Sequence, residues 1–491
     1  MTQAKLSIGT FENGFARLPD RFFSRLVPEP VSSPRLLLLN AVLAEELGLS
    51  TGNVPPDALA HVFSGNVMPE GAEPLASVYA GHQFGNFVPQ LGDGRAILLG
   101  EVRDLKGRLR DLQLKGSGPT PYSRRGDGRA ALGPVLREYL ISEAMHALGI
   151  PTTRALAAVL TGDQVLREGY RPGAVMTRVA ASHVRVGSFE YFAAREDLAA
   201  IKALADYVID RHYPEARDAA SPSLALLQGV IERQAKLIAR WMMVGFVHGV
   251  MNTDNMTLSG ETIDFGPCAF MDAYDPRTVF SSIDQFGRYA YGRQPGIAQW
   301  NLARLAEALV PLIDRDEAKA VELASAAISD FAPIYHEAWL AGMRAKLGWV
   351  EEDEGDRALI GDLLDSLERT GTDFTLAFRR LSETHAEAFL ALVKQDELLA
   401  EWLIRYQARC AREKTSPEDR ANAMRRVNPI YIPRNHHVEA ALAAAVEEGD
   451  LAPFNRLHAI LASPFVEVAG LEAYAEPAGP SERVFQTFCG T

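Results

Sequence analysis

Two segments near the middle of the sequence decide the fold: His248–Asn255, which reads HGVMNTDN, and Thr262–Gly266, which reads TIDFG. Asn255 ends the first segment, seven residues after its histidine, and in the second Asp264 directly precedes Phe and Gly. The apolar pattern typical of a helix runs through Ser223–Val247, just before the first segment. The two segments therefore indicate a polar loop region that interrupts a mostly helical half of the chain.

Upstream of this loop region the pattern is strand-like and rich in glycine. Arg95–Val102 and Leu109–Lys115 are predicted strands, and in the second the alternation directs Lys115 away from the apolar face. Ala130–Leu148 has its apolar residues at helical spacing. With the shorter apolar runs Ala155–Leu160 and Gly173–Val179, these elements predict a small lobe of sheet and helix.

We divide the chain, which we expect to be of the α+β class, into four parts. Residues 1–78 mix short apolar runs with prolines and indicate an irregular lead-in that packs on the core, with one helix near Asn40–Leu47 capped by Asn40. Residues 79–197 form the small β-rich lobe and residues 198–298 a larger helical lobe. Residues 299–491 are predicted to be a helical extension, from Ala- and Leu-rich segments at Leu302–Leu312, Glu317–Ser329 and Val438–Val446.

The composition excludes several classes of protein. With 47% apolar and 23% charged residues, the chain is typical of a globular protein rather than a disordered or fibrous one. Its formal net charge of -13 disfavours a nucleic-acid or membrane-surface binder. Three cysteines exclude a disulfide framework and fit a reducing compartment. Because no signal peptide or apolar run of transmembrane length is visible, we predict a cytoplasmic protein.

A short repeat suggests where phosphate groups bind. The pentapeptide GDGRA occurs at Gly92–Ala96 and again at Gly126–Ala130. In the first copy glycines permit close approach of a ligand, and Arg95 can pair with a phosphate. The second copy opens the predicted helix, and backbone amides at a helix start attract anions. Two such loops flanking a strand that ends in Lys115 predict a phosphate-binding site.

The central segments also match the protein-kinase signature, in which an asparagine lies seven residues after a loop histidine and the aspartate of Asp-Phe-Gly holds Mg²⁺. The histidine, His248, we expect to brace the loop by hydrogen bonds. The kinase catalytic aspartate lies two residues after that histidine, where this chain has Val250. Valine cannot accept a proton, so either the chain is a catalytically inactive relative or another carboxylate has taken over. Asp254 is the nearest candidate for a general base.

The lysine at the end of the second strand requires a carboxylate partner. Glu138 and Glu143 are both on the predicted helix, roughly 140° apart at 100° per residue, so only one can face the cleft. The spacing alone does not decide between them.

Several long strings resemble the selenoprotein O family of pseudokinase-like protein adenylyltransferases over nearly the whole chain. They are Tyr79–Gly85 (YAGHQFG), Gln90–Arg95, Gln113–Gly118, Ser123–Gly128, His248–Asn255, Thr262–Pro267, and Asn428-Pro429 with Asn435-His436-His437. The resemblance implies a protein-kinase-like two-lobed core that binds ATP in the orientation opposite to that found in a kinase. AMP, rather than the γ-phosphoryl group, would then be transferred to Ser, Thr or Tyr hydroxyls of target proteins, with release of pyrophosphate.

The resemblance also implies roles for individual residues. Asp254 would accept the proton, Glu138 would pair with Lys115, and Asn255 and Asp264 would hold Mg²⁺ or, alternatively, Mn²⁺. The nucleotide contacts would be Gly92, Gly94, Arg95, Lys115, Asp127, Gly128, Arg178, Arg185 and Asp264. The guanidinium groups of Arg178 and Arg185 would supply the charge neutralisation that a deeply held triphosphate requires.

Other interpretations stay open. A protein phosphotransferase is one alternative, disfavoured by Val250, and a non-catalytic nucleotide-binding scaffold is another. Relatives are also credited with uridylyl transfer, so the choice between ATP and UTP is not decided. Family members carry a C-terminal cysteine or selenocysteine; here Cys489 would bridge to Cys268 if the tail folds back, although two reduced thiols are the simpler expectation. His436 and His437 we interpret as a helix start rather than a metal site.

Overall fold

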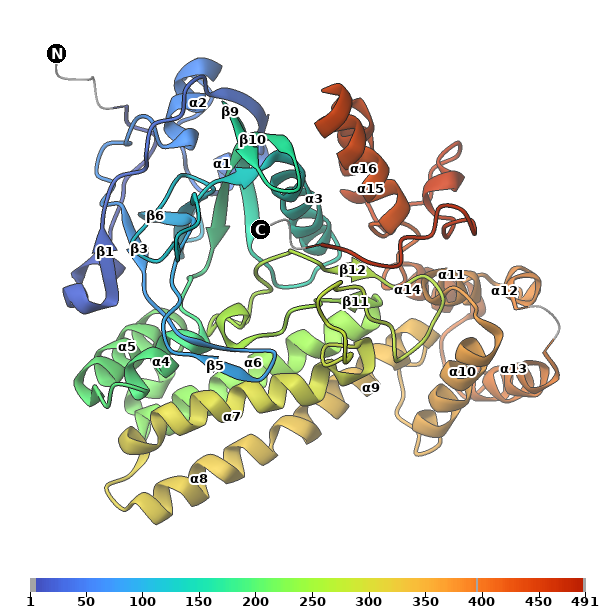
Figure 1. Cartoon of the computed structure of the whole chain (residues 1–491). Coiled ribbons are helices and arrows are strands. Elements are labelled where there is room, and N and C mark those ends of the chain that lie inside the picture. Colours follow the sequence, from blue (N-terminus) through green and yellow to red (C-terminus); the bar gives the residue numbers. More distant parts are fainter. Residues whose placement is uncertain (1–5, 394–395, 489–491) are drawn as a thin grey trace.

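The N-terminal part of the chain forms a twisted sheet in this computed structural model, which describes residues 6–393 and 396–488 (Figure 1). Within the described residues the sheet has eight strands in the order β1-β3-β6-β7-β10-β9-β2, with β8 paired to β10. The strands are β1 Phe23–Arg25, β2 Arg35–Leu39, β3 Leu75–Ser77, β6 Ala96–Arg103, β7 Leu109–Lys115, β8 Ala130–Ala131, β9 Arg154–Leu166 and β10 Tyr170–Ala180. Neighbouring strands in this order pair antiparallel.

Helices cover both faces of this sheet. Alternate residues of β10 point to opposite sides: Met176 joins the core around α3, Leu132–Ala147, while Val175 joins a second core with α1, Ala41–Glu46, and α2, Pro56–Ser64. In β7, Leu112 and Leu114 belong to the second core. The polar residues that alternate with them therefore lie on the α3 side of the sheet.

Most elements of this part agree with the predicted ones. β7 has the predicted bounds, and β6, β9 and β10 contain or overlap the predicted runs. The predicted helix Ala130–Leu148 was wrong at its start, because Ala130 and Ala131 pair with Ala174 and Gly173 as β8 and the helix begins at Leu132.

The lead-in is more regular than the sequence predicted. Its helix α1 is confirmed, and the Asn40 side chain accepts a hydrogen bond from the Leu43 amide at 3.0 Å. The prediction of an otherwise irregular segment was wrong, because this region also supplies α2 and the strands β1, β2 and β3. The strands β1 and β2 take the two ends of the sheet.

The helical part begins after β10. Its long buried helix α6, Pro222–Met243, packs against α7, Gln294–Ile313, and α9, Phe331–Leu347. The predicted helix over Ser223–Val247 ends early, since Phe246–Val247 form the strand β11, paired with β12, Ala269–Phe270. A small hairpin of β4, Gly81–Gln83, and β5, Asn86–Val88, lies over this part. The first helices are α4 Val186–Ala193, α5 Leu198–His212, α6 Pro222–Met243, α7 Gln294–Ile313, α8 Glu317–Ser329 and α9 Phe331–Leu347.

The remaining chain is helical, as predicted for the extension. It contains α10 Asp356–Thr370, α11 Phe374–Leu381, α12 Glu387–Leu392, α13 Glu397–Cys410, α14 Pro417–Arg425, α15 Asn435–Ala443 and α16 Ala452–Leu461, with a π-helical turn at Ala444–Glu448. Helices α15 and α16 (red in Figure 1) return to pack on α3. No helix in the described parts of the chain combines the length and apolarity needed to cross a bilayer.

Candidate active site

Every residue that the sequence assigned to the site lines one cavity of about 1090 Å³. They come from the sheet, from the loops before β6 and β8, from α3, from the residue before α4, and from the loop region after β11. The lining includes Gly92, Gly94, Arg95, Lys115, Asp127, Gly128, Glu138, Arg178, Arg185, Asp254, Asn255 and Asp264.

Asp264 is the centre of the charged groups in this cavity. Its Oδ1 accepts hydrogen bonds from Lys115 Nζ at 2.9 Å and from Arg178 Nη1 at 2.6 Å. Its Oδ2 accepts from Arg185 Nη1 at 2.6 Å. Burial alone would raise the pKa of Asp264, but the charges of Arg185, Lys115 and Arg178 outweigh it and hold this pKa well below its ordinary value.

A second carboxylate shares two of these cations. Glu138 Oε2 accepts from Lys115 Nζ at 2.5 Å, and Glu138 Oε1 accepts from Arg178 Nη1 at 3.1 Å. Glu143 instead binds Arg154, with its Oε2 2.7 Å from Nη2. The structure thus pairs the lysine with Glu138. Lys115, Arg178 and Arg185 therefore share the two carboxylates of Glu138 and Asp264.

The sheet explains how these side chains meet. Lys115 ends β7, and Arg178 lies opposite Gln113 where β10 pairs with β7. Arg178 is only 1% exposed, and its Nη2 donates to Gln113 Oε1 at 2.6 Å. Because a buried cation is costly unless it is paired, this arrangement makes Arg178 a structural as well as an electrostatic element of the site.

Asp254 and Asn255 lie in a short 3₁₀ turn, Thr253–Asn255, and both line the cavity. Asp254 Oδ2 accepts from Gln83 Nε2 at 3.0 Å, whereas Asp254 Oδ1 is buried without a hydrogen-bond partner among the described residues. Burial raises the pKa of Asp254 to about 6, although Gln83 and Arg185 oppose this. A buried carboxylate with an unsatisfied oxygen and a raised pKa is typical of a functional group.

Asn255 is oriented by the backbone of the same loop. Its Nδ2 donates to the Val250 carbonyl at 2.9 Å, so its carbonyl oxygen is not used by this contact. Val250 also lines the cavity, and its apolar side chain can neither accept a proton nor bind a metal ion.

The glycine loops need glycine for steric reasons. A Cβ on Gly92 would lie 2.8 Å from the Ser77 carbonyl oxygen, and one on Gly128 would lie 2.2 Å from the Gly118 carbonyl group. Both have positive φ, 139° and 64°. The second loop leads into β8 rather than opening α3, so the predicted helix start behind it was wrong. Asp127 in this loop pairs with Arg167 at 2.8 Å.

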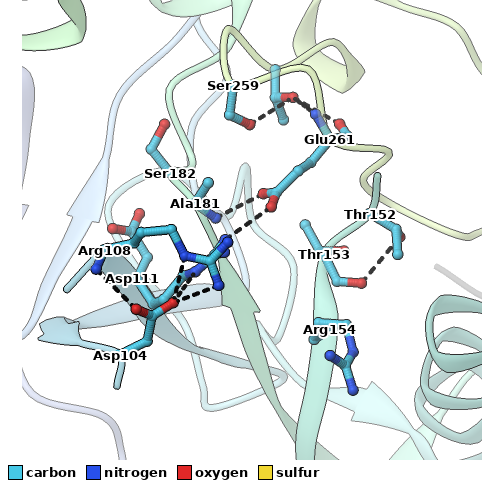
Figure 2. Close-up of polar contacts among 12 residues, drawn as sticks. Asp104, Arg108, Asp111, Thr152, Thr153, Arg154, Ala181, Ser182, Ser259 and Glu261 are labelled. Atoms are coloured by element: carbon cyan, nitrogen blue, oxygen red, sulfur yellow. Dashed lines mark hydrogen bonds and ion pairs between the residues drawn. The ribbon is translucent and has the colours of Figure 1, made fainter. Parts of the chain in front are cut away.

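His248 braces the loop region, as predicted. Its Nε2 donates to the Ile263 carbonyl at 2.9 Å, and its ring stacks on Trp241 with centroids 5.5 Å apart. The segment before Ile263 is tied to the sheet: Figure 2 shows Glu261 pointing to Ala181, whose amide donates to Glu261 Oε2 at 2.7 Å. These contacts hold Asn255 and Asp264 on one side of the cavity.

Some residues at the site were missed as functional candidates. Gln83 holds Asp254, and Arg137 donates from Nη2 to the Cys268 carbonyl at 2.7 Å and from Nε to the Gly266 carbonyl at 3.1 Å. The sequence signal for Gln83 was the string YAGHQFG, which was used only as a sign of family resemblance.

The remaining sequence predictions concern cysteines and histidines. Cys268 is buried beside the Asp-Phe-Gly segment, but Cys489 lies outside the described residues, so a bridge between them stays a prediction. His436 and His437 lie in the first turn of α15, as predicted. The described residues hold no cluster of three or more His, Cys, Asp or Glu side chains arranged to bind a metal.

Comparisons with known proteins identify the family of this chain. Residues 5–462 match a family model described as protein adenylyltransferase SelO. The protein nucleotidyltransferase YdiU of Agrobacterium fabrum is 60% identical over 484 residues, which cover 98% of this chain and 99% of the relative. The protein of the same name from Rhizobium leguminosarum bv. trifolii is 60% identical over 486 residues, which cover 98% of this chain and 97% of that relative. The one from Bradyrhizobium sp. strain ORS 278 is 58% identical over 485 residues, which cover 98% of this chain and 99% of that relative. The chain therefore belongs to the SelO family of protein adenylyltransferases.

Proposed function

We propose that this chain transfers AMP from ATP to Ser, Thr or Tyr hydroxyls of other proteins and releases pyrophosphate. The observation that carries the proposal is the group of three cations, Lys115, Arg178 and Arg185, that converge on Asp264. A triphosphate tail held by these cations would leave the α-phosphorus nearer to the acceptor, whereas a kinase presents the γ-phosphorus. We take the sheet part (residues 79–197) and the first helical part (residues 198–298) as the two lobes of a protein-kinase-like core.

Asp254 is the proposed proton acceptor. It lines the cavity, and with its pKa near 6 it is mostly ionised at neutral pH yet basic enough to take a proton from a hydroxyl. Val250 lacks a group that can do this. As the hydroxyl oxygen bonds to the α-phosphorus, its proton passes to Asp254 and the bond to the pyrophosphate oxygen breaks.

The residues present fit a hard divalent cation. The side-chain carbonyl oxygen of Asn255 is not used in its hydrogen bond to Val250. Asp264 offers two carboxylate oxygens, and two of its three cationic partners, Lys115 and Arg178, also pair with Glu138. Mg²⁺ typically binds through one or two protein ligands plus substrate phosphates. We propose Asn255 and Asp264 as ligands of Mg²⁺, with Mn²⁺ as an alternative; the ion would neutralise phosphate charge when bound.

The glycine loops complete the proposed nucleotide site. Gly92, Gly94 and Gly128 allow close approach of a ligand to the backbone, and Arg95 and Asp127 line the same cavity. We further propose that the protein acts in the cytoplasm and on proteins rather than nucleic acids, since its net charge of -13 disfavours a polyanionic partner.

The test uses ATP labelled at either the α- or the γ-phosphate. With Mg²⁺ and a mixture of proteins as acceptors, we expect label on protein from α-labelled ATP only, and labelling about 10²–10⁴-fold slower with the Asp254→Ala variant. Label from γ-labelled ATP alone would instead make the protein a phosphotransferase. No label from either, with ATP still bound, would favour a scaffold.

A further inference from the structure

The hairpin β4–β5 contacts the loop that carries Asp254 residue by residue. The His82 amide donates to Thr253 Oγ1 at 2.7 Å, and the Phe84 amide donates to Asn252 Oδ1 at 3.1 Å. Between them, the Gln83 side chain donates from Nε2 to Asp254 Oδ2 at 3.0 Å. Three consecutive hairpin residues thus bind three consecutive loop residues.

The hairpin is itself anchored on both sides of Gln83. His82 Nδ1 lies 2.5 Å from Glu190 Oε1 on α4, and the Thr253 hydroxyl donates to the other oxygen of Glu190. On the other side, the Phe84 amide donates to the Tyr289 hydroxyl at 3.1 Å, and that hydroxyl donates to Asn252 Oδ1 at 2.6 Å. Because both ends are held, the Gln83 amide has a fixed position relative to the carboxylate it binds.

The other oxygen of that carboxylate packs against Gly81. A Cβ on Gly81 would lie only 2.4 Å from Asp254 Oδ1, so glycine is required for the hairpin to approach so closely. Oδ1 is buried and has no hydrogen-bond partner among the described residues. One oxygen is therefore bound by Gln83 and the other lies against Gly81, so the hairpin contacts both oxygens of the carboxylate.

We propose that Gln83 is a positioning residue for the transfer reaction, which holds the Asp254 carboxylate in the orientation that meets the acceptor hydroxyl. This inference rests on the proposed function. The glutamine amide exchanges no proton: the hydroxyl proton passes to Asp254, the oxygen bonds to the α-phosphorus, and pyrophosphate leaves. Losing a hydrogen bond that fixes a catalytic group reduces the rate without changing how ATP is held.

The experiment compares Gln83→Met with the wild-type protein. Methionine has a similar length but lacks an N–H donor. We expect kcat for AMP transfer to fall about ten- to hundredfold, as for a hydrogen bond to a charged group. The KM for ATP, the affinity for a non-hydrolysable ATP analogue and the midpoint of thermal unfolding should stay at wild-type values. Asn86→Ala is the matched control, because Asn86 pairs with Gln83 across the hairpin and is exposed.

A second pair of variants separates positioning from a general loss of structure. In an Asp254→Ala background, followed by long incubations with α-labelled ATP, Gln83→Met should cause little further loss, since there is no carboxylate left to hold. A wild-type kcat for Gln83→Met, or an equal loss in the Asp254→Ala background, would overturn the inference while leaving AMP transfer established. A wild-type protein that transfers no label from α-labelled ATP would overturn the proposed function and this inference together.

Discussion

Replacing Arg178 by methionine tests whether the site depends on buried charge pairing before any nucleotide binds. Arg178 Nη1 pairs with Glu138 Oε1 at 3.1 Å and with Asp264 Oδ1 at 2.6 Å, and Nη2 donates to Gln113 Oε1 at 2.6 Å. Methionine fills most of the same apolar volume but removes all three hydrogen bonds.

The expected loss in the free energy of unfolding depends on which ion pairs remain in the variant. Removing one partner of a buried ion pair costs about 3–5 kcal/mol when the other charge is left uncompensated. Here Lys115 still pairs with both carboxylates and Arg185 still pairs with Asp264, so we expect a smaller loss of about 2–3 kcal/mol in the free energy of unfolding. The affinity for ATP should also fall by about ten- to hundredfold, because one charged donor to phosphate is lost.

Urea unfolding of the nucleotide-free protein measures the first quantity, and calorimetric titration with a non-hydrolysable ATP analogue measures the second. Arg217→Met is the matched control, because Arg217 pairs with Asp206 and Asp210 while its side chain is 38% exposed. Such surface pairs contribute about 0–1 kcal/mol. Equal stability losses in the two variants, or a nucleotide-free Arg178→Met protein as stable as the wild type, would refute the argument from buried pairing.

Other predictions concern the base, a loop, a buried histidine and the metal. Asp254→Ala should slow AMP transfer about 10²–10⁴-fold while calorimetry finds unchanged affinity for the ATP analogue; a parallel loss of binding would contradict its role as base. Gly128→Ala should weaken ATP binding about tenfold or more, because its Cβ would collide with the Gly118 carbonyl; Gly169→Ala, which has open space around it, should bind normally. Burial lowers the pKa of His248 below 6.5, so only the unfolded chain takes up a proton as the pH falls below that value. The free energy of unfolding should then decrease by about 1.4 kcal/mol for each unit by which the pH falls, as the contribution of this group. If urea unfolding of His248→Gln shows the same pH dependence as the wild type, His248 does not make this contribution. Chelation of divalent metal should stop label transfer, and added Mg²⁺ or Mn²⁺ should restore it; transfer that persists in chelator would exclude Asn255 and Asp264 as ligands of an essential ion.

The elements that the sequence predicted well are those with a strong local pattern. The bounds of β7 and α8 agree with the prediction because alternation and helical spacing continue over their full length. The strands β1, β2 and β3 were missed because they are short and gain their stability from distant partners. For example, Leu36 of β2 pairs with Val159 of β9, and no pattern within the lead-in indicates this.

The candidate site likewise contains residues that local sequence patterns predicted and others that they could not. Spacing around His248 and the Asp-Phe-Gly motif was sufficient to single out Asn255 and Asp264. It could not choose between Glu138 and Glu143, since that depends on where Arg154 lies in the folded chain. Arg178 on β10 and Arg185 before α4 came only from family resemblance, because the sequence around an arginine gives no local sign that it will be buried. Gln83 had no chemical signal of its own, since its partner is 171 residues away.

The two ends of the sheet have a consequence for how the protein is made. The strands at both ends, β1 and β2, come from residues 23–39, whereas β9, the partner of β2, ends only at Leu166. A nascent chain therefore emerges from the ribosome with its edge strands first and cannot place β2 until more than a hundred further residues have followed. Such long-range closure is slow. Truncation of the chain through Arg25 would remove β1 and leave the edge of β3 unpaired. We therefore expect such truncated chains to self-associate.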